Sequence, residues 1–445
     1  MFKWLLPILL LITQHAWAIS PNAKRIILES SDPLANIDTF NSYVDSLKPT
    51  MDLDPEALSK VTLTATGQVS AITSRVSAIS FTQGTAANQP YLSRPDQVEN
   101  IQLNAEALGG SNWFAIRSSI SANSTAAPDG TTTADTLIED SSTNTHLLNP
   151  SGVALTSGVK YRFSGYGKAK ERTQIRLLAS GAVPNTGLNV DLSTCTEITT
   201  TGSPLNKTYT SVGNGWCRFS FEVAATSTAS GYQEFYLLNA GSQSYAGDGA
   251  SGLYLWGAQL QRASMQPSYI QTTASPIYGS LTGRRGLVFD GSNDQMTSAS
   301  YTSAIFAAGA KEAYIITDSN TASGTQVILR PASSYFDLRI SGAGYQFVNY
   351  DGTGDQTQST HAANRVELFS FRHASGYLYS SIQGGPETAG TASGDTTNIS
   401  TALTLGHAST PLNGNMYRFI TFNKTNSPAV RAKLQRGFRK FYKTQ

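Results

Sequence analysis

The sequence has few charged residues. Only 14% of its 445 side chains are Asp, Glu, Lys or Arg, against about 25% in an ordinary soluble domain. The 32 basic and 30 acidic residues leave a formal charge of +2, so no global field attracts nucleic acid or acidic ligands. We therefore expect no nucleic-acid partner. A hydrophobic content of 40% also excludes a disordered chain.

Long apolar runs are missing beyond the first residues. The one apolar run follows Lys3 and ends before Gln14, well short of the roughly 20 residues that a membrane-spanning helix needs. Ala16 and Ala18 then frame a small-x-small cleavage site. This pattern is typical of a cleaved signal peptide over residues 1–18. We expect an exported protein, secreted or held at a cell or virion surface, without a transmembrane anchor.

Cysteine is scarce, and the chain has only Cys195 and Cys217. An exported protein can keep a disulfide, because its compartment is oxidising. A pair of separate buried thiols is the alternative that the sequence leaves open.

Motifs of common catalytic sites are also missing. Retaining glucan hydrolysis needs two carboxyl groups about 5 Å apart, and no Glu-x-Asp-x-Glu strand occurs. The five histidines lack the spacings of zinc sites, and neither a Gly-x-Ser-x-Gly elbow nor a phosphate loop is present. We therefore expect a protein that is not an enzyme, although a site built from distant loops would leave no local motif.

What is present indicates an all-β protein. From Val61 onward apolar residues alternate with hydroxyl-bearing ones, as in short antiparallel strands. Turns such as Asp129-Gly130 and Asp290-Gly291 punctuate the chain at intervals typical of sandwiches and jelly rolls. We predict two β-sandwich or jelly-roll modules, one inserted in the other.

Helical patterns occur only near the two ends of the chain. Residues 19–50 carry apolar side chains near a 3.6-residue period, which predicts a short N-terminal helical segment. Near the C-terminus, Ser427 is a cap and Pro428 takes the first helical position. Leu434 and Phe438 belong to one apolar stripe of the helix that follows.

Two separated stretches resemble a concanavalin A-like or laminin-G-like lectin domain. The opening motifs lie in residues 51–96, including an Ala-Asn-x-Pro turn that ends at Pro90. The apolar-Phe-Asp-Gly strand that normally follows them comes some 200 residues later, at Phe289. The resemblance implies one discontinuous sandwich made of residues 51–96 and 276–445. Insertion is tolerated because the ends of a module often lie close together.

The intervening residues 97–275 resemble a carbohydrate-binding-module-like jelly roll of the kind found in phage fibre and secreted bacterial proteins. Five motifs occur in the family's order, among them one around Trp216 and one around Trp256. In that family the segments around Cys195 and Cys217 are neighbouring strands, so the resemblance implies a disulfide between them.

The candidate ligand residues are aromatic side chains beside polar loops. They are Tyr232 and Tyr245 in the insert, and Tyr345, Tyr350 and Asp351 in the outer sandwich. Aromatic faces stack on sugars, and amide or carboxylate groups bind sugar hydroxyls. A tight hairpin turn that carries incidental tyrosines is the alternative.

Asp129 and Asp248 precede glycines in two family-like loops of the insert. Jelly rolls of this family often hold a structural calcium ion on such oxygens, so these residues are the candidate metal ligands. Turn formation alone also explains Asp-Gly, and it is the explanation that the sequence favours. No other cofactor is expected.

Together these patterns favour a secreted, non-catalytic protein that binds carbohydrate or recognises a cell surface, as an adhesin or a fibre component does. Its expected partners are extracellular or cell-surface glycans, and homo-oligomers stay open. One alternative is a structural or assembly component of a virion or extracellular filament without a ligand. The other is a polysaccharide-degrading enzyme.

Overall fold

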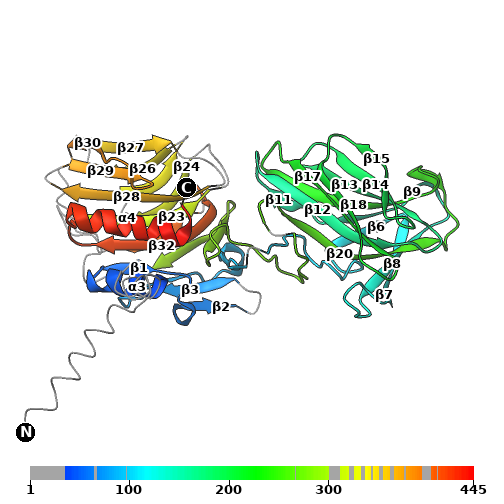
Figure 1. Ribbon diagram of the computed structural model, residues 1–445, viewed down its shortest axis with the longest axis horizontal. Helices are drawn as coiled ribbons and strands as arrows, with labels where there is room; N and C mark the ends of the chain where they lie inside the picture. Colours follow the sequence, from blue (N-terminus) through cyan, green and yellow to red (C-terminus); the bar gives the residue numbers. More distant parts are fainter. Residues whose placement is uncertain are drawn as a thin grey trace, which may run out of the picture.

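The computed structural model describes residues 36–444, apart from 65–67, 97, 266, 300–310, 320–324, 332–335, 342–343, 350–353, 361–364, 375–376, 393–401 and 408. The proposed signal peptide lies outside the described residues. Figure 1 shows two β-rich bodies side by side, one formed by the two ends of the chain and one by its middle. The prediction of an all-β protein is confirmed. In the described part of the chain, no helix is long and apolar enough to cross a membrane.

The outer sandwich consists of two antiparallel sheets that combine strands from both ends of the chain. One sheet contains β1 (Met51–Leu53), β5 (Tyr91–Leu92), β21 (Leu287–Asp290), β23 (Lys311–Asp318), β28 (Val366–Ala374), β29 (Tyr377–Ile382), β30 (Thr388–Ala392) and β32 (Asn413–Phe422). The other contains β2 (Val61–Leu63), β3 (Val69–Thr73), β4 (Ser80–Thr82), β22 (Gln295–Ser298), β24 (Thr325–Pro331), β25 (Phe336–Ser341), β26 (Gly344–Asn349), β27 (Gly354–Thr360) and β31 (Leu403–Gly406). Two 3₁₀ turns, η1 (Leu58–Lys60) and η2 (Ala86–Asn88), lie between the early strands.

Strand β32 is buried on both faces, because each face meets a different apolar layer. Met416 and Phe419 point into the core between the two sheets. Tyr417, Ile420 and Phe422 pack instead against the helices α3 (Ile37–Ser46) and α4 (Pro428–Tyr442). This arrangement explains why every residue of β32 is buried, rather than every second one.

The two predicted helices are present, and their ends follow the expected local chemistry. Helix α4 begins with Ser427 as N-cap, whose hydroxyl accepts from the Val430 N–H at 3.4 Å, and Pro428 occupies its first turn. Helix α3 begins at a capping box between Asn36 and Thr39.

The middle of the chain forms a second sandwich, the insert. Its first sheet has the order β15 (Thr196–Thr201), β14 (Thr186–Asp191), β13 (Gln174–Gly181), β18 (Ala229–Leu238), β10 (Leu147–Pro150) and β6 (Trp113–Ile116), with β11 (Val153–Leu155) also on β18. Its second sheet has the order β16 (Leu205–Ser211), β17 (Trp216–Ala224), β12 (Lys160–Lys168), β20 (Gly252–Arg262), β8 (Ala134–Glu139) and β7 (Ser118–Thr125). A small ribbon pairs β9 (Thr143–Thr145) with β19 (Ser244–Ala246).

A disulfide joins Cys195 and Cys217, with their Cα atoms 5.3 Å apart. Cys195 lies just before β15 and Cys217 lies in β17, so the bond connects opposite sheets of the insert. The two strands are therefore not hydrogen-bonded neighbours, unlike the arrangement that the family resemblance implied. The bond closes the sandwich at one edge.

The insert and the outer sandwich meet at a junction held by polar contacts. A buried ion pair joins Arg262 to Glu99, with 2.7 Å between Nη2 and Oε2. The linkers themselves pair through the bridge between Asn100 and Ile277. Hydrogen bonds between the modules include those from Arg262 Nη2 to the Gly279 carbonyl at 2.9 Å and from Asn413 Nδ2 to the Thr156 hydroxyl at 3.2 Å.

The outer sandwich contains a buried carboxyl group, Asp294, which is 2% exposed. Burial, and then the charge of Asp290, raises the pKa of Asp294 to about 8. Between about pH 4 and pH 8 the folded chain thus keeps a proton that the unfolded chain has released. We expect the free energy of unfolding to fall as the pH rises through this window, by at most about 1.4 kcal/mol per pH unit from this group.

Urea unfolding at pH 5 and pH 8 checks this prediction when wild type is compared with Asp294→Asn. The variant cannot ionise, so it should lose less stability than wild type between the two values. An equal loss in both proteins would show that Asp294 ionises normally in the folded chain.

Candidate functional site

One face of the first sheet of the insert carries polar and aromatic side chains where a sandwich usually presents a simple solvated surface. Along β13, Ile175 and Leu177 point into the core, so the alternation of a strand turns Arg176 outward. We call this outward surface the polar face. It consists of Asn149, Arg176, Ser180, Asn189, Tyr232, Glu234 and Tyr236.

The strand register brings three of these residues into one row across the sheet. Arg176 on β13 pairs with Asn189 on β14 and with Tyr236 on β18. Neighbouring strands lie about 4.8 Å apart, so the three side chains stand next to one another although they come from widely separated parts of the sequence. The row is therefore a product of the fold.

The two terminal nitrogens of the Arg176 guanidinium group are held by hydrogen bonds. Its Nη1 donates to Gln243 Oε1 at 2.7 Å, and its Nη2 donates to the Thr201 hydroxyl at 2.9 Å. The guanidinium carbon lies 5.9 Å from the centre of the Tyr236 ring. Burial lowers the pKa of Arg176, and the nearby Tyr236 and Glu234 offset part of this effect.

Three polar atoms of this face are buried and lack a partner within the protein. They are Arg176 Nε, Asn189 Oδ1 and Asn149 Oδ1. Asn189 is only 7% exposed. A buried polar atom without a partner costs roughly 1–3 kcal/mol, and native proteins keep few of them. One donor and two acceptors on one face therefore indicate a site at which a polar ligand would supply the missing hydrogen-bond partners.

The carboxylate of Glu234 is already engaged by its neighbours. The Tyr236 hydroxyl donates to Oε2 at 2.6 Å, and the Ser180 hydroxyl donates to Oε1. Burial, and then the hydrogen bond to Glu234, raises the pKa of Tyr236 above its ordinary value. Tyr236 therefore stays a neutral donor at physiological pH.

The Tyr232 ring packs closely against Gly152 and Gly181, which have no side chain to keep it away from the backbone. A Cβ atom placed on Gly152 would be 3.0 Å from the Tyr232 ring, and one placed on Gly181 would be 2.8 Å from it. Tyr232 itself is half-buried. This predicted ligand residue thus belongs to the polar face.

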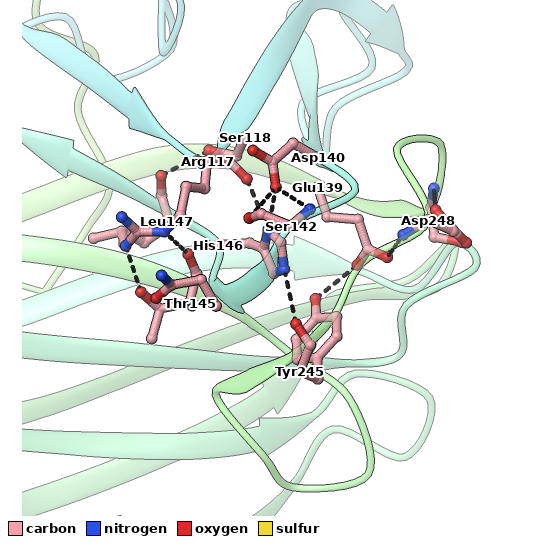
Figure 2. A network of polar contacts seen from close by, with 12 residues as sticks. Arg117, Ser118, Glu139, Asp140, Ser142, Thr145, His146, Leu147, Tyr245 and Asp248 are labelled. Atoms are coloured by element: carbon pink, nitrogen blue, oxygen red, sulfur yellow. Dashed lines mark hydrogen bonds and ion pairs between the residues drawn. The ribbon is translucent and has the colours of Figure 1, made fainter.

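Tyr245, the second predicted residue of the insert, belongs to a polar network at the edge of the insert (Figure 2). We call it the rim network, and it comprises Arg117, Glu139, His146, Arg172, Tyr245 and Asp248. The Tyr245 hydroxyl donates to Glu139 Oε2 at 2.7 Å, and its ring lies 4.8 Å from that of His146. These contacts make Tyr245 an anchor of β19.

Glu139 is the centre of the rim network. Arg172 donates to both of its oxygens, and the Asp248 N–H donates to Oε1 at 3.0 Å. Burial alone would raise the pKa of Glu139, but the hydrogen bonds from Arg172 and Tyr245 outweigh it and lower the pKa. Because β19 directly follows Gln243, the network also positions the side chain that holds Arg176.

The prediction for Tyr345 is wrong. Tyr345 is fully buried in the core of the outer sandwich, where it stacks on Phe369 with ring centres 5.0 Å apart. Strand alternation turns it inward, and it pairs with the equally buried Ile340 on β25. Tyr350 and Asp351 lie outside the described residues.

The two predicted metal ligands use their carboxylates within their own turns. Asp129 Oδ1 accepts from the Thr131 N–H at 2.9 Å. Asp248 Oδ1 accepts from the N–H groups of Ala250 and Ser251 at 2.8 and 2.7 Å. Among the residues that the structure describes, no three His, Cys, Asp or Glu side chains gather as a metal site. Calcium at these turns stays a prediction.

Sequence reasoning missed Arg176, Asn189, Asn149 and Glu234. The signal that could have found two of them, Arg176 and Glu234, is strand alternation, because residues 174–177 and 234–237 alternate polar or tyrosine side chains with apolar ones. Their assembly into one face depends on strand register, which no local pattern contains.

No protein-family model and no curated protein matches this sequence. Among solved structures, the chain is similar to the CBM40 domain of the Ruminococcus gnavus IT-sialidase bound to α2,6-sialyllactose, at 14% identity and a TM-score of 0.24 over 29% of this chain and 84% of that one. It is also similar to domain 4 of the Geobacillus stearothermophilus arabinanase AbnA in complex with arabinotriose, at 11% identity and a TM-score of 0.27 over 34% and 76%.

A third similar structure is the receptor-binding domain of botulinum neurotoxin type G, at 11% identity and a TM-score of 0.28, over 35% of this chain and 44% of that one. The chain thus spans less than half of the toxin domain. The sialidase and arabinanase modules were solved with sugars bound. At these TM-scores the likeness carries no information about function, which depends on the side chains.

Proposed function

We propose that this chain is a secreted, non-catalytic carbohydrate-binding protein, and that its insert binds glycan on the polar face. The observation that carries the proposal is the cluster of buried, unpartnered polar atoms on Arg176, Asn189 and Asn149. Side chains at binding sites commonly change rotamer on binding, and we expect such a change to bring these buried atoms into contact with a ligand on the face.

The chemistry of the polar face matches that of a sugar. A sugar hydroxyl is both donor and acceptor, so it can donate to an amide oxygen of Asn189 and accept from the Nε–H of Arg176. The half-buried rings of Tyr232 and Tyr236 add apolar surface beside these groups. Amides, a guanidinium group and aromatic rings together supply both kinds of contact that a pyranose offers.

The charge of the polar face favours a neutral or weakly charged glycan. Arg176 and Glu234 carry opposite charges and no other residue of the face is charged. A face with one carboxylate also lacks the pair that glycoside hydrolysis uses. Both features support binding without catalysis.

A glycan array with wild type, Arg176→Ala and Arg218→Ala tests the proposal. Arg218 is the matched control, because it also lies over a tyrosine ring, 5.3 Å from the centre of Tyr166, but on the other sheet. We expect wild type and Arg218→Ala to bind the same glycans, and Arg176→Ala to bind them roughly tenfold or more weakly, since hydrogen bonds to charged groups contribute about 1.5–3 kcal/mol.

Two results would contradict this expectation. If wild type bound no glycan, the structural role in a virion or filament would be favoured. If Arg218→Ala lost binding while Arg176→Ala kept it, the site would lie on the opposite sheet.

A further inference from the structure

A cleft of about 410 Å³ lies between the insert and the outer sandwich. The insert contributes the segments around Gly152 and Ser230, and the outer sandwich contributes Asp290, Asn413 and Asn415. This volume lies within the range of small-molecule sites in proteins, about 300–1,000 Å³. Both modules therefore form its walls.

Asn415 presents an unpartnered acceptor at this cleft. It is 1% exposed, and its Nδ2 donates to the two oxygens of Asp318 at 3.0 and 3.1 Å. Its Oδ1 is buried and has no partner within the protein. Since Asp318 occupies the amino end of the amide, the carbonyl end is left for a donor in the cleft, such as a hydroxyl group.

The other polar groups of the cleft fit a hydroxyl-bearing ligand rather than an ion. Glu99 and Arg262 neutralise each other's charge in their buried ion pair. Asp290 already accepts from the Ser292 N–H at 2.7 Å through Oδ1. Exposed Ser230 adds a hydroxyl to the lining of the cleft.

The cleft lies next to the polar face. Ser230 lines the cleft and points to the same side of β18 as Tyr232, Glu234 and Tyr236, because they alternate along one strand. Gly152, which also lines the cleft, lies against the Tyr232 ring. From Ser230 to Tyr236 the strand rises about 20 Å at 3.3 Å per residue, a span that only an extended ligand covers.

We propose that the ligand is an extended oligosaccharide that lies along β18, with one end on the row of Arg176 and Asn189 and the other in the cleft against Asn415. This inference rests on the proposed function and goes further, because it makes the outer sandwich part of the binding site. A single sugar would occupy the polar face alone.

Titration calorimetry with one glycan from the array, prepared at increasing chain lengths, tests the inference. The proteins are wild type, Asn415→Ala and Ser230→Trp. Ser230 is exposed, so its replacement blocks the cleft without disturbing the core, whereas Asn415 is buried and its variant needs a folding check. Ser121→Trp on β7 is the matched control, because Ser121 is an exposed strand serine of the opposite sheet.

We expect the affinity of wild type and Ser121→Trp to rise at least tenfold from the shortest to the longest glycan. Ser230→Trp and Asn415→Ala should bind the shortest glycan like wild type and lose this gain. Equal affinity at all lengths, or an unchanged gain in Ser230→Trp, overturns the inference and leaves the polar face in place. An absence of binding at every length overturns the proposed function and the inference with it.

Discussion

Replacing Arg418 by alanine is expected to destabilise the outer sandwich by about 3–5 kcal/mol, because it leaves a buried carboxylate without its main partner. Arg418 is fully buried, and it donates from Nε and Nη2 to the two oxygens of Asp52 at 3.0 and 2.7 Å. Its Nη1 donates to Asn41 Oδ1 at 2.7 Å. Arg75 also reaches Asp52, at 3.0 Å, but from a more exposed position.

The matched control for Arg418 is Arg94→Ala, which removes an arginine from an exposed pair. Arg94 and Asp96 lie 2.7 Å apart, with side chains 44% and 43% exposed. Exposed pairs contribute about 0–1 kcal/mol. Urea unfolding should therefore separate the two variants by several kcal/mol. Similar midpoints for both would show that the buried pair does not hold the sandwich together.

Removing the disulfide with Cys195→Ala and Cys217→Ala together is expected to destabilise the insert by roughly 3 kcal/mol. The two cysteines are 22 residues apart in sequence, and closing a loop of that size restricts the unfolded chain by about this amount. The urea midpoint of the insert, followed by the fluorescence of buried Trp216 and Trp256, measures the loss.

Two observations control this second prediction. Wild type treated with a reductant should unfold at the same midpoint as the double variant. Wild type that is denatured without reductant should show no reactive thiol. Two reactive thiols per chain would show that Cys195 and Cys217 are not bonded to each other.

The secondary structure was largely predictable from the sequence, because strand alternation and helix caps are local. Ser427 and Pro428 mark the start of α4, and the alternation from Val61 indicated strands. The same alternation does not say which face of a strand is buried. Tyr345 illustrates this, because one register step decides whether it faces solvent or the core.

The candidate site was less predictable, because it depends on strand pairing between distant segments. Tyr232 was found because it is an aromatic residue in a polar segment. No comparable feature of the sequence singles out Arg176 and Asn189. Only the register between β13, β14 and β18 places them beside Tyr236. Their unpartnered atoms are visible only in three dimensions.

The most direct test of glycan binding on the polar face is the nuclear magnetic resonance signal of the Arg176 Nε–H during a glycan titration. This group is buried and has no partner in the unbound protein, so a sugar hydroxyl that accepts from it should shift its signal in proportion to the bound fraction. The side-chain amide of Asn189 should shift in parallel. If a glycan bound while both signals stayed in place and those of Arg218 and Lys168 on the opposite sheet moved, the polar face would not be the binding site.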